Sequence, residues 1–194
     1  VILFVMALFL SVSLLTYNPA DAVGEWFKSF DRFYQADVLV WPQNTVVQNA
    51  CGYLGAALAD LLFTALGVGA FFLVIGIGVV AVSLLQKQTW ESAWSKTLGW
   101  LLTLVGMTTL VSMLVPGATV GPIIGAGGYL GTLGAGLMHM LFAGTGGLIL
   151  AASVLAIGLF LWTEYILVKL LVGLLVGVMS AFSLVAPSDL WERL

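Results

Sequence analysis

The stretch from residue 52 to residue 85 holds a single charged side chain, Asp60, among residues that are mostly apolar or glycine. A run of this length suits a helix that crosses the roughly 30 Å of bilayer hydrocarbon. The whole chain of 194 residues shares this character, since 61% of it is hydrophobic and 8% is charged. Soluble domains carry about 25% charged residues. The sequence therefore predicts an all-α integral membrane protein.

Four apolar segments are predicted to cross the bilayer, at about residues 1–16, 61–81, 98–115 and 146–163. Asp60 then falls in the first turns of the second helix, at headgroup level, where a carboxylate costs far less than at the bilayer centre. There it either stays solvated or pairs with a polar neighbour. The alternative is that it fixes the outer loops or contacts a partner protein.

Two further apolar stretches, 121–142 and 165–186, compete with these four. The links that join them to 146–163 are too short for both to cross fully, so four crossings are favoured over six. Five crossings would put the two ends of the chain on opposite sides of the membrane and are the least favoured. We expect an outer-leaflet or re-entrant helix in 121–142 and an interfacial helix in 165–186, the latter packed by small residues or making a subunit contact. Four glycines at the spacing that allows close helix approach are candidate packing positions: Gly127, Gly131, Gly173 and Gly177.

The distribution of basic residues predicts the orientation of the chain. The linker 86–97 and the stretches after 163 together hold four basic residues, whereas the loop 17–55 holds two and the loop 116–145 holds none. Because basic residues favour the cytoplasmic side, we expect a cytoplasmic loop at 86–97, periplasmic loops at 17–55 and 116–145, and both termini in the cytoplasm. The chain starts at Val1, inside an apolar run, and we expect it to be a fragment.

The first outer loop carries the most informative polar pattern. Asn18 and Pro19 are expected to end the first helix, because a residue before proline is pushed out of the helical region. Asp21 is a candidate N-cap for a following helix with an aromatic face that includes Trp26, Phe30 and Phe33. This face either rests on lipid headgroups and the chain's own helices or docks a partner.

Motifs for catalysis and for cofactor binding are missing from the sequence. No phosphate-binding GxxxxGK[ST] loop, HExxH, CxxC or serine elbow occurs, and the lone His139 is expected to serve packing. The net charge of −3 argues against nucleic-acid binding. We predict no catalytic residue, no metal site and no cofactor in this segment.

Three stretches resemble one family. "LLTYNPAD" at 14–21, "GYLGAALADLLFTALGVGAF" at 52–71 and "FAGTGGLILAASVLAIGLFLWTE" at 142–164 are similar to the four-span membrane domain of FtsK/SpoIIIE-type DNA translocases. The matching positions in the first two stretches are Asn18, Pro19, Asp21, Gly52, Leu54, Ala59, Asp60, Leu62, Phe63 and Gly67.

The resemblance implies a membrane anchor and divisome-interaction module in the bacterial inner membrane, at the division septum. It would tether a cytoplasmic hexameric ATPase that pumps double-stranded DNA during chromosome segregation and cell division. That motor, with its ATP and Mg²⁺, is absent from this chain, so the partners of this segment would be the lipid bilayer and cell-division membrane proteins, with oligomerisation through the motor. Asp60 and the turn that holds Asn18, Pro19 and Asp21 would shape the periplasmic face. A small transporter or channel and a motor-less division scaffold are the alternatives.

Overall fold

The computed structural model describes residues 1–21, 40–85, 93–117 and 125–163. All regular elements in these residues are helices, as the sequence predicts. They are α1 (Ile2–Leu15), α2 (Gly52–Leu66), α3 (Gly69–Leu85), α4 (Ala93–Leu114), α5 (Gly128–Leu141) and α6 (Gly144–Thr163). The predictions for Trp26, Phe30, Phe33, Gly173, Gly177 and the helix 165–186 lie outside the described residues.

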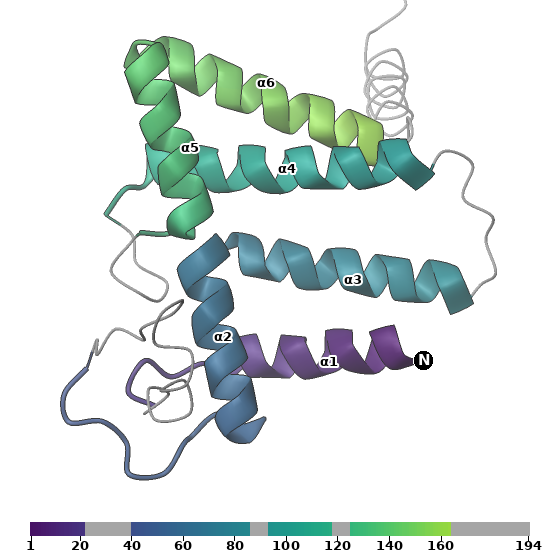
Figure 1. Ribbon diagram of the computed structural model, residues 1–194, viewed down its shortest axis with the longest axis vertical. Coiled ribbons are helices and arrows are strands. Elements are labelled where there is room, and N and C mark those ends of the chain that lie inside the picture. Colours follow the sequence, from purple (N-terminus) through teal and green to yellow (C-terminus); the bar gives the residue numbers. More distant parts are fainter. Residues whose placement is uncertain (22–39, 86–92, 118–124, 164–194) are drawn as a thin grey trace, which may run out of the picture.

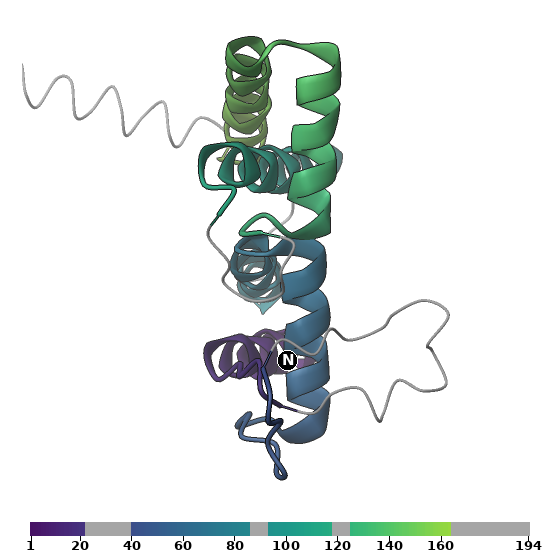
Figure 2. The ribbon, with the colours of Figure 1, turned by 90° about the vertical axis from the view of Figure 1, so that its left-hand side faces the viewer.

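Four helices, α1, α3, α4 and α6, lie side by side in a row, and α2 and α5 cross one end of that row (Figure 1). In the view turned by 90°, α2 and α5 follow one another along a single line (Figure 2). The start of α1 and the end of α6 both lie at the opposite end of the row (Figure 1). The described chain therefore begins and ends on the same side.

One arrangement of three helices occurs twice along the chain. In α1, α2 and α3 the first helix runs toward the crossed end, the second crosses that end, and the third runs back (Figure 1). The helices α4, α5 and α6 follow the same course, and α2 and α5 point the same way. We call these the first and second units, and the C-terminal end of α2 meets the N-terminal end of α5 between them.

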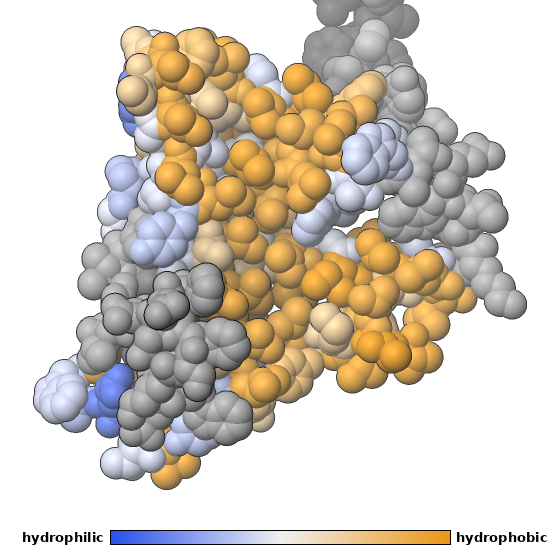
Figure 3. All heavy atoms as spheres, in the orientation of Figure 1, coloured by the Kyte–Doolittle hydropathy of each residue, from blue (hydrophilic) through white to orange (hydrophobic). Residues whose placement is uncertain are grey.

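The lengths of the row helices suit a bilayer to different degrees. Trp94–Leu114 and Gly144–Thr163 are each long and apolar enough to cross a membrane on their own. With 17 residues, α3 spans about 26 Å at 1.5 Å per residue, and α1 is a shorter apolar helix of 14 residues. Apolar side chains dominate the surface of the row, and the most hydrophilic residues in view lie at the crossed end (Figure 3).

The structure differs from the expected continuous helix at 61–81. The chain breaks after Leu66, and α2 and α3 are bent relative to each other by 111°. The break occurs at Gly67, whose φ of 55° and ψ of −131° lie in a region open to glycine. The backbone N–H of Val68 donates to the carbonyl of Ala126, 2.8 Å away. Residues 61–66 therefore belong to the crossing helix α2, and only α3 runs along the row.

Close backbone contact at this break requires small residues on both sides. A Cβ on Gly67 would lie 2.0 Å from the carbonyl oxygen of Ala126, and one on Gly128, itself at φ 63°, would lie 2.5 Å from the Gly67 nitrogen. The two units are joined here by backbone atoms in direct contact.

Small residues also hold α4 against α6. A Cβ added at Gly158 would lie 2.4 Å from the backbone nitrogen of Thr103, and one at Gly106 would lie 2.7 Å from that of Leu155. In lipid there is no hydrophobic driving force between helices, so their association depends on close packing of this kind. The first unit contains a buried apolar cluster of Leu10, Leu14, Ala59, Phe63, Ala70 and Val74.

Candidate functional site: a polar cluster at the crossed end

Asp21 fixes the far end of the first loop. The residue is 4% exposed, and its carboxylate accepts three hydrogen bonds from the stretch before α2. Oδ1 accepts from Asn44 Nδ2 at 2.8 Å and from the Gln48 backbone N–H at 3.0 Å, and Oδ2 accepts from the Asn49 N–H at 3.1 Å. A buried carboxylate needs such donors to offset the loss of water. Asp21 therefore ties the end of α1 to the approach to α2.

Asn49 extends this link to both helices. Its Nδ2 donates to the carbonyls of Ser13 and Thr16, at 2.9 and 3.3 Å, at the C-terminal end of α1 where carbonyls lack helical partners. Its Oδ1 accepts from the Cys51 N–H at 2.9 Å, at the start of α2. Ser13 is fully buried, and its hydroxyl donates to the Gly55 carbonyl at 2.6 Å. Side chains thus satisfy helix-terminal groups on both sides.

Asp60 lies on the inner face of α2 and is 7% exposed. The phenolic hydroxyl of Tyr17 donates to its Oδ1 at 2.9 Å, and the Tyr17 ring packs on Phe63 at a centroid distance of 4.9 Å. The sequence left open whether Asp60 stays solvated or pairs with a polar neighbour. In the structure it is paired with Tyr17. The carboxylate positions α2 against the end of α1.

The remaining predicted loop residues surround the same cluster. Asn18 donates through Nδ2 to Gln48 Oε1 at 2.9 Å, and its Oδ1 accepts from the Ala20 N–H at 3.0 Å, which forms a tight turn around Pro19. Gly52 opens α2 with a φ of 66°, and no atom lies within 4 Å of a Cβ built there. Its role is conformational.

Sequence reasoning missed Ser13 and Asn49, which connect the cluster. Both are short polar side chains in apolar surroundings, and neither belongs to a charged motif. One signal was available: Asn49 lies just before the apolar run that starts α2, where asparagine favours a hydrogen bond to the backbone. The structure brings Asn18, Asp21, Gly52 and Asp60 together with these two residues at the crossed end.

The packing glycines of the second unit lie against α4. A Cβ on Gly127 would be 2.1 Å from Ser112 Oγ, and one on Gly131 would be 2.4 Å from the Thr108 carbonyl oxygen. The same face of α5 includes Gly134, where a Cβ would be 2.1 Å from Thr109 Oγ1. Here glycines let α5 lie directly on α4.

The cluster is an arrangement for positioning helices. Within the residues that the structure describes, no group of three or more His, Cys, Asp or Glu side chains could hold a metal ion. Each carboxylate of the cluster is engaged by donors from the protein. The geometry suits a fixed surface at the crossed end.

Residues 1–175 match the family described as the 4TM region of DNA translocase FtsK/SpoIIIE. The chain belongs to this family. The resemblance noted in the three sequence stretches is thereby confirmed. No curated protein and no solved structure shows a significant match to the chain.

Membership in the FtsK/SpoIIIE 4TM family defines the general role of the chain. It is a multi-pass membrane region of a translocase family, and this region is not itself the catalytic part. The row helices and the apolar surface fit that assignment (Figure 3). In this FtsK/SpoIIIE 4TM region, the polar cluster and the helices α2 and α5 form one end, and the described chain enters and leaves at the other.

Proposed function

We propose that this chain anchors a septal DNA translocase in the bacterial inner membrane and contacts division proteins through its crossed end. In this account it tethers a cytoplasmic, ATP-driven pump of double-stranded DNA that acts in chromosome segregation and cell division. The observation that carries the proposal is that α1 starts and α6 ends at the same end of the row, in a chain of this family. A motor attached after α6 would then lie on the side where the chain begins.

The basic residues support the orientation. Lys96 lies near the start of α4, at the end of the row where the chain enters and leaves. Since lysine and arginine favour the cytoplasmic side, this end faces the cytoplasm and the crossed end faces the periplasm. The motor side and the partner side are then separated by the membrane.

The crossed end offers an exposed apolar stripe for partners. Along α5, Tyr129, Leu133 and Leu137 recur every four residues, and these residues are 54–64% exposed. On α2, Tyr53 and Leu54 are exposed close to the polar cluster. Division partners anchored in the same membrane could reach this surface from the side. Asp60 contributes indirectly, since it is buried and positions α2.

A channel or transporter finds less support in the polar residues of the row. The hydroxyl of Thr103 donates to the Gly99 carbonyl at 2.8 Å, and that of Thr108 donates to the Leu104 carbonyl at 2.9 Å. Ser153 likewise bonds the Ile149 carbonyl at 2.8 Å. Each of these side chains bonds the preceding turn of its own helix, which needs no aqueous path.

The experiment replaces the membrane region of a family member with this chain. The chain is fused to the motor of a related translocase and a fluorescent protein, in cells depleted of their own translocase. We expect a septal band and restored division. The variant Asp60→Leu should insert at normal abundance with a weaker septal band, because it removes the hydrogen bond from Tyr17, a contact worth about 1–3 kcal/mol.

The control variant Tyr17→Phe keeps the ring that packs on Phe63 and loses only the hydroxyl. It should show an intermediate septal signal at equal membrane abundance. Uniform membrane fluorescence of the unmodified fusion would contradict the proposed recruitment to the septum. A septal band unaffected by Asp60→Leu would contradict the proposed partner surface that Asp60 positions.

A further inference from the structure

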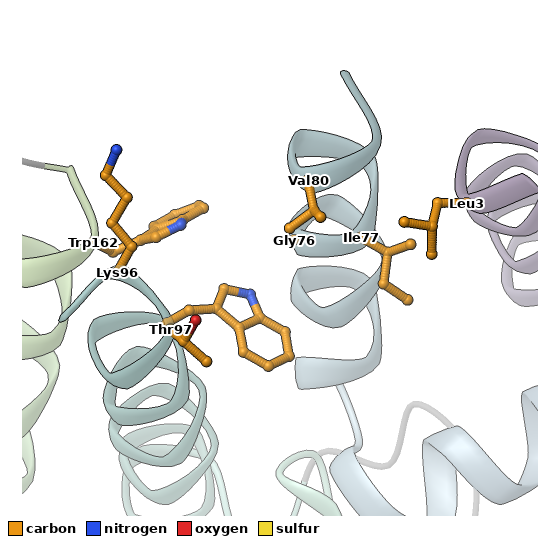
Figure 4. Close-up of a pocket in the computed structure, with 8 residues that line it drawn as sticks. Leu3, Gly76, Ile77, Val80, Lys96, Thr97 and Trp162 are labelled. Atoms are coloured by element: carbon orange, nitrogen blue, oxygen red, sulfur yellow. The ribbon is translucent and has the colours of Figure 1, made fainter. Parts of the chain in front are cut away.

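A cavity of about 260 Å³ opens between the two units, at the end of the row opposite α2 and α5. All four row helices line it. Leu3 comes from α1, Gly76, Ile77 and Val80 from α3, Lys96, Thr97 and Trp100 from α4, and Trp162 from α6. Figure 4 shows Lys96, Thr97 and Trp162 on one side and Val80, Ile77 and Leu3 on the other.

The walls of the cavity are aromatic and aliphatic. Phe72 stacks on Trp100 at a centroid distance of 6.2 Å and meets Trp162 edge-on at 5.2 Å, which fixes both indole rings. The Trp100 ring approaches α3 closely because the opposing residue is Gly76, where a Cβ would be 2.2 Å from Nε1. Aromatic side chains from α3, α4 and α6 therefore pack together beside the cavity.

One basic side chain lines the cavity. Lys96 is the one charged residue among the eight that line it, and none of those eight is acidic. Lysine at the end of a row helix places its ammonium group at headgroup level while its methylene chain covers apolar surface. Tryptophan side chains also prefer this level. The mouth therefore lies where a lipid phosphate lies.

We propose that this cavity binds one anionic phospholipid, with an acyl chain between the two units and the phosphate beside Lys96. Hydrocarbon is the only apolar solvent available to an opening between bilayer helices, and an unfilled cavity would forfeit dispersion contacts with its walls. Basic sites between transmembrane helices on the cytoplasmic side attract anionic headgroups. The contacts between α2 and α5 join the two units at the crossed end. The lipid joins α3 to α4 at the opposite end of the row.

The test measures lipid retained by the purified full chain. Detergent-solubilised protein is titrated with phosphatidylglycerol or with phosphatidylcholine of identical acyl chains, and bound lipids are counted by native mass spectrometry. The wild-type chain should retain one phosphatidylglycerol in preference to phosphatidylcholine. Lys96→Gln should reduce this preference about fivefold, the effect of one basic residue near an anionic surface, and Lys96→Arg should keep it.

Two further variants separate the cavity from general surface charge. Lys87→Gln removes the same charge nine residues earlier in the sequence, before α4, and should leave the preference intact. Val80→Phe fills the cavity and should reduce the binding of both lipids. Three results would each overturn the proposal. They are equal retention of the two lipids by the wild-type chain, an equal loss of the preference for phosphatidylglycerol in Lys87→Gln and Lys96→Gln, and undiminished lipid binding in Val80→Phe.

Discussion

The two units of this chain share one course but hold their crossing helices in different ways. In the first unit, α2 is tied to α1 and the loop by hydrogen bonds that the carboxylates of Asp21 and Asp60 accept and that the Asn49 side chain donates. In the second unit, α5 lies on α4 through Gly127 and Gly131, with backbone and small side chains in contact. The first unit thus relies on directional polar contacts and the second on close approach.

The difference follows from the length of the connection that leads into each crossing helix. A loop of more than thirty residues, 16–51, enters α2, and hydrogen bonds to its ends fix a single geometry. The connection before α5 is far shorter, at 115–127, so packing alone can place the helix. A buried polar cluster whose groups are all hydrogen-bonded specifies one arrangement. The loss of one partner costs much stability because the remaining buried groups are left unpaired.

The junction between the units should be the most sensitive position. Gly67→Ala places a Cβ 2.0 Å from the Ala126 carbonyl oxygen and forces an L residue into a glycine conformation. We expect a loss of more than about 3 kcal/mol, since backbone strain and a clash with backbone combine. Thermal unfolding in detergent micelles measures it.

Gly52→Ala is the matched control for this substitution. It has the same sign of φ, 66°, but no neighbour within 4 Å of the added Cβ. Its cost should be about 1–2 kcal/mol, the cost of a left-handed conformation for an L residue. Equal destabilisation by the two alanines would show that the contact between α2 and α5 contributes nothing.

The polar cluster of the first unit should respond next. Asp21→Ala leaves the Asn44 side chain and the N–H groups of Gln48 and Asn49 without their acceptor. A loss of about 2–3 kcal/mol is expected for buried donors left unpaired. Hydrogen exchange should accelerate in residues 44–49 while the second unit keeps its protection. Faster exchange in α5 as well would remove the distinction between the units.

The smallest effect is expected in the second unit. The Ser112 hydroxyl is buried beside Gly127 and has no hydrogen-bond partner in the part of the chain that the structure describes. Ser112→Ala removes an unpaired polar group, so stability should change by no more than about 0.5 kcal/mol or should rise slightly. A clear loss of thermal stability would mean that hydrogen bonding, not packing, holds α5.

Three of the six described helices could be predicted closely from apolar run lengths. The expected segments at 1–16, 98–115 and 146–163 correspond to α1, α4 and α6 within a few residues. The division of 61–81 could not be predicted, because glycine is common in membrane helices and the residues on both sides of Gly67 are equally apolar. The contacts with Ala126 and Gly128, which are distant in sequence, explain the break.

The candidate site was predictable where a residue breaks the local pattern. Asp60 is conspicuous in an apolar run, and Asn18, Pro19 and Asp21 form a turn sequence. Ser13 and Asn49 were missed because their importance comes from burial between two helix ends, which no spacing along the chain reports. The cavity between the units depends on four separate helices and left no linear signal.

The most direct test of the anchor account is the side on which the crossed end lies. In a Cys51→Ala background, a cysteine is placed at Thr45, an exposed residue beside the polar cluster, or at Ser92, which precedes α4. In intact bacterial cells, a membrane-impermeant maleimide should label Thr45→Cys and leave Ser92→Cys unlabelled until the cells are opened. Labelling of Ser92→Cys with protection of Thr45→Cys would place the motor side outside the cell and contradict the account.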